Sequence, residues 1–104
     1  MFFDKKIKLD KEALYKINEG FELREVVGKK VVVYMGKDEA FNGIIRLNEE
    51  GEEVWKLLLE GSSPSLVTSS LEEIYDADHD TIEANVLEVM NNLLTENVIH
   101  KCEK

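Results

Sequence analysis

The chain has 104 residues, of which 43% are hydrophobic and 34% charged, and this composition is typical of one small globular domain. No apolar run approaches the roughly 20 residues of a membrane helix, and the start at Met1 lacks the apolar stretch of a signal peptide, so we expect no membrane partner. The single cysteine, Cys102, excludes an internal disulfide and favours a cytoplasmic location.

The net charge of −9 is unevenly distributed. Residues 1–47 carry ten Lys or Arg against eight Asp or Glu, whereas residues 48–104 carry three against fourteen. An acidic second half would repel phosphate backbones, so we expect no nucleic-acid partner.

Residues 1–19 mix apolar side chains with lysines and show no clear period. We predict an N-terminal arm with a short extended piece and a helical turn at 11–16, ended by Gly20. Phe2 and Phe3 of this arm could anchor a homodimer. The folded domain would then span residues 20–104.

Three stretches with strand character follow the arm: 21–27, 30–35 and 41–47. Gly28-Lys29 is the predicted two-residue turn between the first two, because glycine tolerates the positive φ that such turns require. Short connections between consecutive strands predict an antiparallel meander. In the third strand, alternation predicts one face with Phe41, Ile45 and Leu47 and another with Ile44 and Arg46.

The apolar spacing becomes helical after Asn48. Asn48 can cap a first helix that has Glu49 and Glu50 in its first turn, and Gly61 suits the end of that helix. Ser63-Pro64 predicts the start of a second helix, with serine as the cap and proline in the first turn. Its apolar residues are expected at 66, 67, 71, 74 and 75.

A third helix is predicted from Asp80, which with Glu83 has the spacing of a capping box, to about Thr95. Residues 98–99 are expected to form a short strand that closes against the sheet. The fold class that follows is α+β and winged-helix-like, with a three-stranded antiparallel sheet packed on three helices.

The residues give little support for catalysis or metal binding. The acidic loop at 76–80 resembles the start of a calcium loop, but Thr81 and Leu87 occupy the positions where an EF-hand needs glycine and glutamate. Two histidines and Cys102 do not supply the four ligands of a structural zinc site. There is no Gly-x-Ser-x-Gly turn and no glycine-rich phosphate loop, so we expect no enzyme, no metal and no cofactor.

Gly43 and Gly51 lie inside a predicted strand and a predicted helix. A glycine inside a strand often marks a bulge or a close backbone approach. Two interpretations stay open: a bulge with a tight helix–sheet contact, or a backbone edge that is left free for a partner.

Several runs resemble the coenzyme PQQ synthesis protein D (PqqD) family. They are GFELREVVG at 20–28, FNGIIRLNEEGEEVW at 41–55 and TIEANVLEVM at 81–90, followed by the apolar pairs at 93–94 and 98–99. The resemblance implies a winged-helix-like recognition element for ribosomally made, modified peptides. Such a module is a non-catalytic binder of a precursor's leader peptide, which it presents to a modifying enzyme, commonly a radical SAM maturase that carries its own iron–sulfur clusters.

The resemblance also implies a site. The leader would add as a strand to the edge of the third strand and pack against the third helix. Arg46 could pair with an acidic leader residue and Glu88 with a basic one, whereas Asn85 departs from the acidic residue common in the family. The implied peptide-binding residues are Asn42, Gly43, Ile44, Ile45, Arg46 and Leu47 on the strand and Asn85, Glu88, Val89 and Asn92 on the helix.

Two alternatives of other classes compete with this interpretation. A winged-helix DNA-binding regulator would share the architecture, but it needs a basic recognition helix, and residues 80–95 contain no Lys or Arg. A self-associating structural subunit, dimerised through the arm, is the other alternative.

Overall fold

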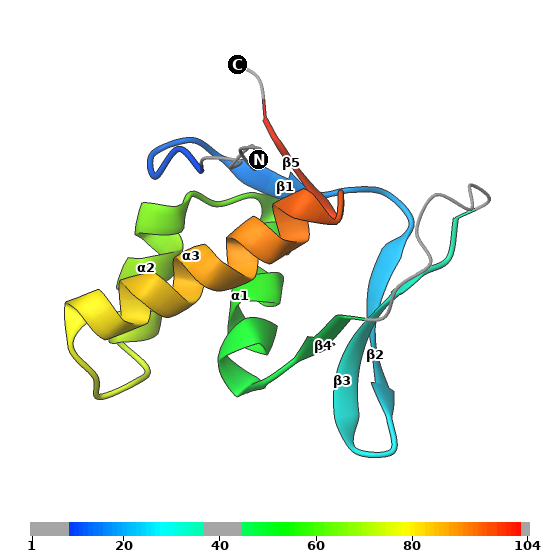
Figure 1. Cartoon of the computed structure of the whole chain (residues 1–104), viewed down its shortest axis with the longest axis horizontal. Helices are drawn as coiled ribbons and strands as arrows, with labels where there is room; N and C mark the ends of the chain where they lie inside the picture. Colours follow the sequence, from blue (N-terminus) through cyan, green and yellow to red (C-terminus); the bar gives the residue numbers. More distant parts are fainter. Residues whose placement is uncertain (1–8, 37–44, 103–104) are drawn as a thin grey trace, which may run out of the picture.

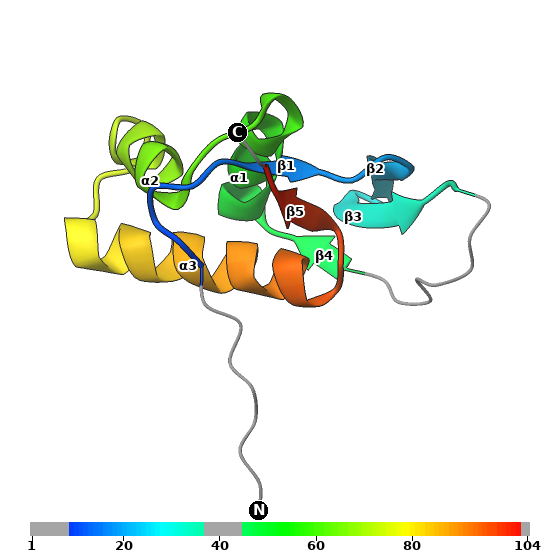
Figure 2. The same cartoon turned by 90° about the horizontal axis from the view of Figure 1, so that it is seen from above.

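The computed structural model describes residues 9–36 and 45–102, which form three helices and two small sheets (Figure 1). In chain order the elements are β1 (Tyr15–Ile17), β2 (Phe21–Val26), β3 (Lys29–Tyr34), β4 (Ile45–Leu47), α1 (Glu49–Glu60), α2 (Pro64–Glu72), α3 (His79–Thr95) and β5 (Ile99–Lys101). Figure 2 shows α3 along one side of the molecule, with α1 and α2 packed against it.

The larger sheet is an antiparallel meander in the order β2-β3-β4. Leu23, Val32 and Ile45 lie opposite one another in the register, so their side chains share the face that meets the helices. This confirms the predicted α+β class, with three antiparallel strands and three helices. Of the third predicted strand, residues 45–47 are observed and residues 41–44 lie outside the described part of the chain.

The β2–β3 turn differs from the prediction by one residue. Val26 pairs with Lys29, so the turn consists of Val27 and Gly28, with φ of 51° and 76°, rather than Gly28 and Lys29. Lys29 is therefore a strand residue, paired with Val26, and not a turn residue. We expected a positive φ only at glycine, but Val27, which is β-branched, also has one.

The second sheet corrects the prediction for the arm. Residues 15–17 form β1, which pairs antiparallel with β5, where we predicted a helical turn at 11–16. Tyr15 is 2% exposed and also exchanges two backbone hydrogen bonds with Ser62, of 2.8 and 3.0 Å. The predicted terminal strand therefore exists, but it pairs with β1 and not with the meander. Both partners of β1 lie more than 40 residues away in sequence, so local periodicity could not predict this pairing.

The helix starts follow the capping residues, with one correction. The Asn48 side chain accepts from the Gly51 N–H at 2.8 Å, and the Ser63 side chain accepts from the Leu66 N–H at 3.2 Å. The third helix is capped by Asp78 instead of Asp80, and the Asp78 side chain makes no capping hydrogen bond. The third helix ends at Thr95, as predicted. Asn97, which follows the helix end, has a positive φ of 67°, a conformation that stops the helix.

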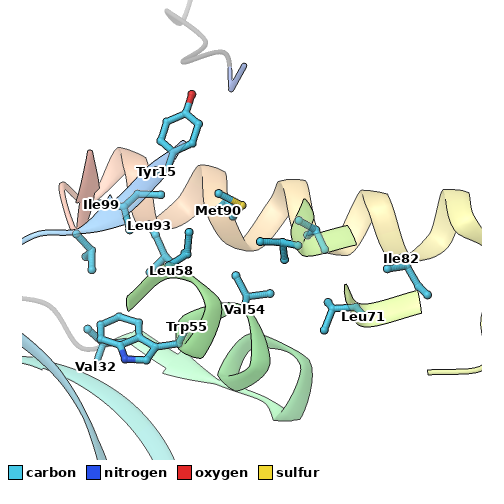
Figure 3. Close-up of a cluster of buried hydrophobic side chains, with 13 residues drawn as sticks. Tyr15, Val32, Val54, Trp55, Leu58, Leu71, Ile82, Met90, Leu93 and Ile99 are labelled. Atoms are coloured by element: carbon cyan, nitrogen blue, oxygen red, sulfur yellow. The ribbon is translucent and has the colours of Figure 1, made fainter. Parts of the chain in front are cut away.

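One hydrophobic core joins the helices to both sheets (Figure 3). Val32 enters it from β3, Trp55 and Leu58 from α1, and Met90 and Leu93 from α3, all at most 3% exposed. Leu66 and Ile74, which we expected among the apolar residues of the second helix, are each 57% exposed, and Ile74 lies beyond the end of α2 at Glu72.

Candidate functional site

The edge of β4 is the first element of the site. Strand β4 lies at the end of the β2-β3-β4 order, and β3 pairs with one side of it, from Lys30 opposite Leu47 to Val32 opposite Ile45. Within residues 9–36 and 45–102, no strand pairs with the other side. An unpaired edge presents free N–H and C=O groups to any extended peptide.

A groove of about 650 Å³ lies at the Leu47 end of β4. Its residues come from the β2–β3 hairpin, from β4, from the start of α1 and from α3, and they are Gly28, Lys29, Lys30, Arg46, Leu47, Asn48, Glu49, Glu52 and Val89. Leu47 and Val89 are partly buried and pack against the core, so they form its apolar part. This volume lies within the range of about 300–1,000 Å³ that is common for ligand sites.

The start of α1 is held closely against β4. A Cβ added at Gly51 would lie 3.2 Å from both Cβ and Cδ2 of Leu47, which explains why a glycine occupies the first turn of this helix. The tight helix–sheet contact predicted for Gly51 is therefore present, and it sets the position of Leu47 in the groove. Gly43 lies outside the described residues.

The third helix contributes its site residues unequally. Val89 lines the groove, whereas the Asn85 side chain donates to Glu50 Oε1 of α1 at 3.4 Å and borders a small pocket with Tyr75. Glu88 and Asn92 are exposed. Asn42, Gly43 and Ile44 of the implied site fall in the undescribed segment, and Ile45 is partly buried behind the strand edge. The groove thus brings together three of the implied residues, Arg46, Leu47 and Val89.

Charges of both signs line the groove. Lys30 Nζ lies 3.2 Å from Glu25 Oε1 and 3.7 Å from Glu52 Oε2. The hydrogen bond that Lys30 donates to Glu25, followed by the charge of Glu52, raises the pKa of Lys30. Lys29 and Arg46 make no ion pair with the other described residues, which leaves them free for an anionic group on a ligand.

Sequence reasoning missed the hairpin and the start of α1 as parts of the groove, namely Gly28, Lys29, Lys30, Asn48, Glu49 and Glu52. The predicted antiparallel meander could have indicated the hairpin residues. In such a meander the start of the second strand, at Lys30, lies opposite the end of the third strand, at Leu47. Tyr75 was also missed as a neighbour of Asn85. Partial burial, followed by the charges of Glu49 and Glu53, raises the pKa of the Tyr75 phenol.

The described residues hold no group of three or more His, Cys, Asp or Glu side chains that could bind a metal ion. Among the same residues, no helix is long and apolar enough to cross a membrane.

Comparison with known families gives a match between residues 29–99 and the model of the family described as Coenzyme PQQ synthesis protein D (PqqD). The chain belongs to the PqqD family. The matched range includes β3, β4, all three helices and the first residue of β5, and therefore every residue of the implied site. A search of curated proteins finds no significant match.

Two solved structures share the fold of this PqqD family member. The solution NMR structure of the PqqD truncation of Methylobacterium extorquens PqqCD, described as a functional and stand-alone RiPP recognition element, has a TM-score of 0.69 and 22% identity, covering 89% of this chain and 95% of that one. The structure of TbiB1 in complex with the TbiA(beta) leader peptide has a TM-score of 0.66 and 18% identity, covering 86% of this chain and 99% of that one.

Proposed function

We propose that this chain is a non-catalytic adaptor that binds the leader peptide of a precursor by strand addition and presents it to a modifying enzyme. The observation that supports this most directly is the edge of β4, which no other strand of residues 9–36 and 45–102 pairs with, together with a groove lined by Leu47 of β4 and Val89 of α3. Strand addition needs a free edge and a few side-chain pockets, and it needs no catalytic group. Membership of the PqqD family and the leader complex of TbiB1 agree with this function.

The geometry of an added strand specifies the leader's chemistry. Side chains of a strand alternate between faces, so every second leader residue would point toward Leu47 and Val89, and these leader residues should be apolar. The residues between them would lie beside Arg46 on the other face, where an acidic side chain is favoured. Glu88, exposed on α3, would favour a basic leader residue near the helix.

The binding residues proposed are Asn42, Gly43, Ile44, Ile45, Arg46 and Leu47 on the strand and Asn85, Glu88, Val89 and Asn92 on the helix. The receiving enzyme would be a radical SAM maturase that works in the cytoplasm. We predicted residues 20–104 as the recognition domain. Since β1 pairs with β5 and Tyr15 is buried in the same core, we propose that the domain also includes residues 15–17.

Isothermal titration with a synthetic leader, taken from a precursor gene beside this one, tests the proposal. We expect 1:1 binding, with amide shift changes in ¹⁵N NMR spectra concentrated at Ile45–Leu47 and around Val89. A scrambled leader of equal composition is the matched control. Absence of binding, both by the full chain and by a version without residues 1–8, would refute the proposal.

The predicted homodimer through the N-terminal segment is a separate question. Light scattering of the full chain and of the version without residues 1–8 measures it directly. A monomer in both cases would remove self-association as a function, and it would leave leader binding unaffected.

A further inference from the structure

The tip of the β2–β3 hairpin combines backbone strain with exposed apolar side chains. Val27 has φ of 51°, a conformation in which the Cβ of a β-branched residue crowds the backbone, and two-residue turns of this kind strongly prefer Asn, Asp or Gly. Its side chain is 93% exposed, and that of Val26 is 51% exposed. Burial within this chain therefore gives no reason for valine at this position.

The outer face of the meander extends this apolar tip. In the register, Arg24, Val31 and Arg46 lie opposite one another, on the face away from the core residues Leu23, Val32 and Ile45. Val26 and Lys29 form a pair on that same outer face. Val31 is only 9% exposed and Val33 is half-buried, so the accessible part of this area is smaller. We name that accessible part the hairpin surface: Glu22, Arg24, Val26, Val27 and Lys29.

The charge of the hairpin surface is opposite to that of the protein. Arg24 is paired with Glu22 at 2.7 Å, but Lys29 and the adjacent Arg46 have no ion-pair partner among the described residues. The whole chain carries a net charge of −9. A basic and apolar surface on an acidic protein fits a partner that offers an apolar pocket edged by carboxylates.

The hairpin surface is continuous with the groove. Gly28 and Lys29 line the groove, and Lys30 pairs with Leu47, so the hairpin tip stands at the Leu47 end of β4. Figure 1 shows the hairpin projecting away from the helices. A peptide that leaves the groove at this end passes the tip, and a protein that receives the peptide there must approach the same surface.

We propose that the hairpin surface docks the peptide-modifying enzyme, with Val27 inserted into an apolar pocket and Lys29 facing carboxylates at its rim. This inference rests on the proposed function, since it assumes that this chain presents a leader to a modifying enzyme. A second copy of this chain is the competing occupant, and the light-scattering measurement distinguishes it from the enzyme.

Substitution Val27→Asn separates docking from a structural role. Asparagine adopts positive φ readily, so the variant should raise Tm by about 5 °C. Leader affinity, measured by titration, should stay within twofold of the wild type. Affinity for the purified modifying enzyme encoded beside this chain, measured by biolayer interferometry without leader, should fall at least tenfold. Leu66→Gln, at a leucine that is 57% exposed on α2, is the matched control and should leave all three values unchanged.

Unchanged enzyme affinity in the Val27→Asn variant would overturn the inference, as would wild-type protein that binds leader but not the enzyme. A wild-type dimer in light scattering that Val27→Asn dissociates would assign the hairpin surface to a second copy instead, which also overturns it. Failure of the wild type to bind leader is a different result, because it refutes the proposed function and is measured separately from enzyme binding.

Discussion

The helices and the β2–β3–β4 meander differ in how they contribute to the core. Each of α1, α2 and α3 supplies at least two fully buried side chains, and β1 and β5 close the core from the other side. Within the described residues the meander supplies Val32 alone at this depth, while Phe21, Leu23, Ile45 and Leu47 pack only partly against the core. The helical part therefore carries most of the stability.

The meander, which is less buried, exposes surfaces that an element buried in the core would not expose. It has an edge at β4 that no other described strand pairs with, an outer face with cations and valines, and a projecting hairpin. Burial of the same residues in a larger core would remove these surfaces. The comparison indicates that stability and recognition reside in different parts of a small domain, and it can be tested by substitution in each part.

The largest effect is expected at Leu58, whose side chain is fully buried on α1, the helix that packs against α3 and β1. Leu58→Ala should lower the free energy of unfolding by about 2–5 kcal/mol, because it removes apolar contacts and leaves a cavity. Leu59→Ala is the matched control, since the next residue is 51% exposed and its loss should cost less than about 0.5 kcal/mol. Urea unfolding measures both, and equal costs would contradict the described packing of α1.

The second effect concerns recognition. Arg46→Glu should weaken leader binding about tenfold, or about 1.4 kcal/mol, because it replaces attraction for an acidic leader residue by repulsion at the strand edge. The Tm should change little, since Arg46 is exposed and makes no ion pair with the described residues.

Arg24→Glu is the control for charge. It changes the net charge equally on the same face, but it lies on β2, two strands away from the open edge. Equal losses of leader affinity in titrations of the two variants would show that the edge of β4 has no special role.

The third effect compares two helix caps. Asn48→Ala should lower the free energy of unfolding by about 1 kcal/mol, because its side chain accepts the Gly51 N–H at 2.8 Å. Asp78→Ala should cost less, since the Asp78 side chain makes no capping hydrogen bond and contributes only its charge near the helix start. Thermal unfolding of both variants tests the ranking, and a larger loss at Asp78 would contradict it.

The sequence predicts the elements of this fold well wherever the information is local. The caps at Asn48 and Ser63 and the close packing of Gly51 follow from residue chemistry within one helical turn. The pairing of β1 with β5 could not be predicted, because its hydrogen bonds join residues more than 80 positions apart. The turn at Val27 was misplaced because a β-branched residue violates the local preference for its conformation.

The candidate site divides in the same way. Arg46, Leu47 and Val89 were named from the sequence through a family resemblance, and all three line the groove. Lys29 and Glu49 were not predicted as site residues. Lys29 lines the groove because of the register between β3 and β4, and Glu49 lines it because α1 packs against Leu47. Such three-dimensional proximity is not encoded in a local pattern.

The smallest effect is expected at His79, where α3 begins. Its Nδ1 lies 2.8 Å from Glu72 Oε2, and the hydrogen bond and charge of Glu72 raise the pKa of His79 above its ordinary value of 6.5, with smaller contributions from Glu83 and Asp80. Because the folded state holds the proton more tightly, the stabilisation is fully present below pH 6.5 and is lost as the pH rises through the higher folded pKa. Lys11, which pairs with Glu83 at 3.3 Å, competes for that carboxylate.

His79→Gln should therefore lower Tm by about 2 °C near pH 5.5 and by less at pH 8.5, since exposed pairs contribute little. Glu72→Gln should remove the same pH-dependent part, and the double variant should lose no more than either single one. Unfolding scans at the two pH values measure this. A difference between wild type and His79→Gln that grows with pH would reverse the sign and show that the imidazole is held neutral by its surroundings. Because the pair lies in the helical part, leader binding should not depend on it, which separates the smallest stability effect from recognition at β4.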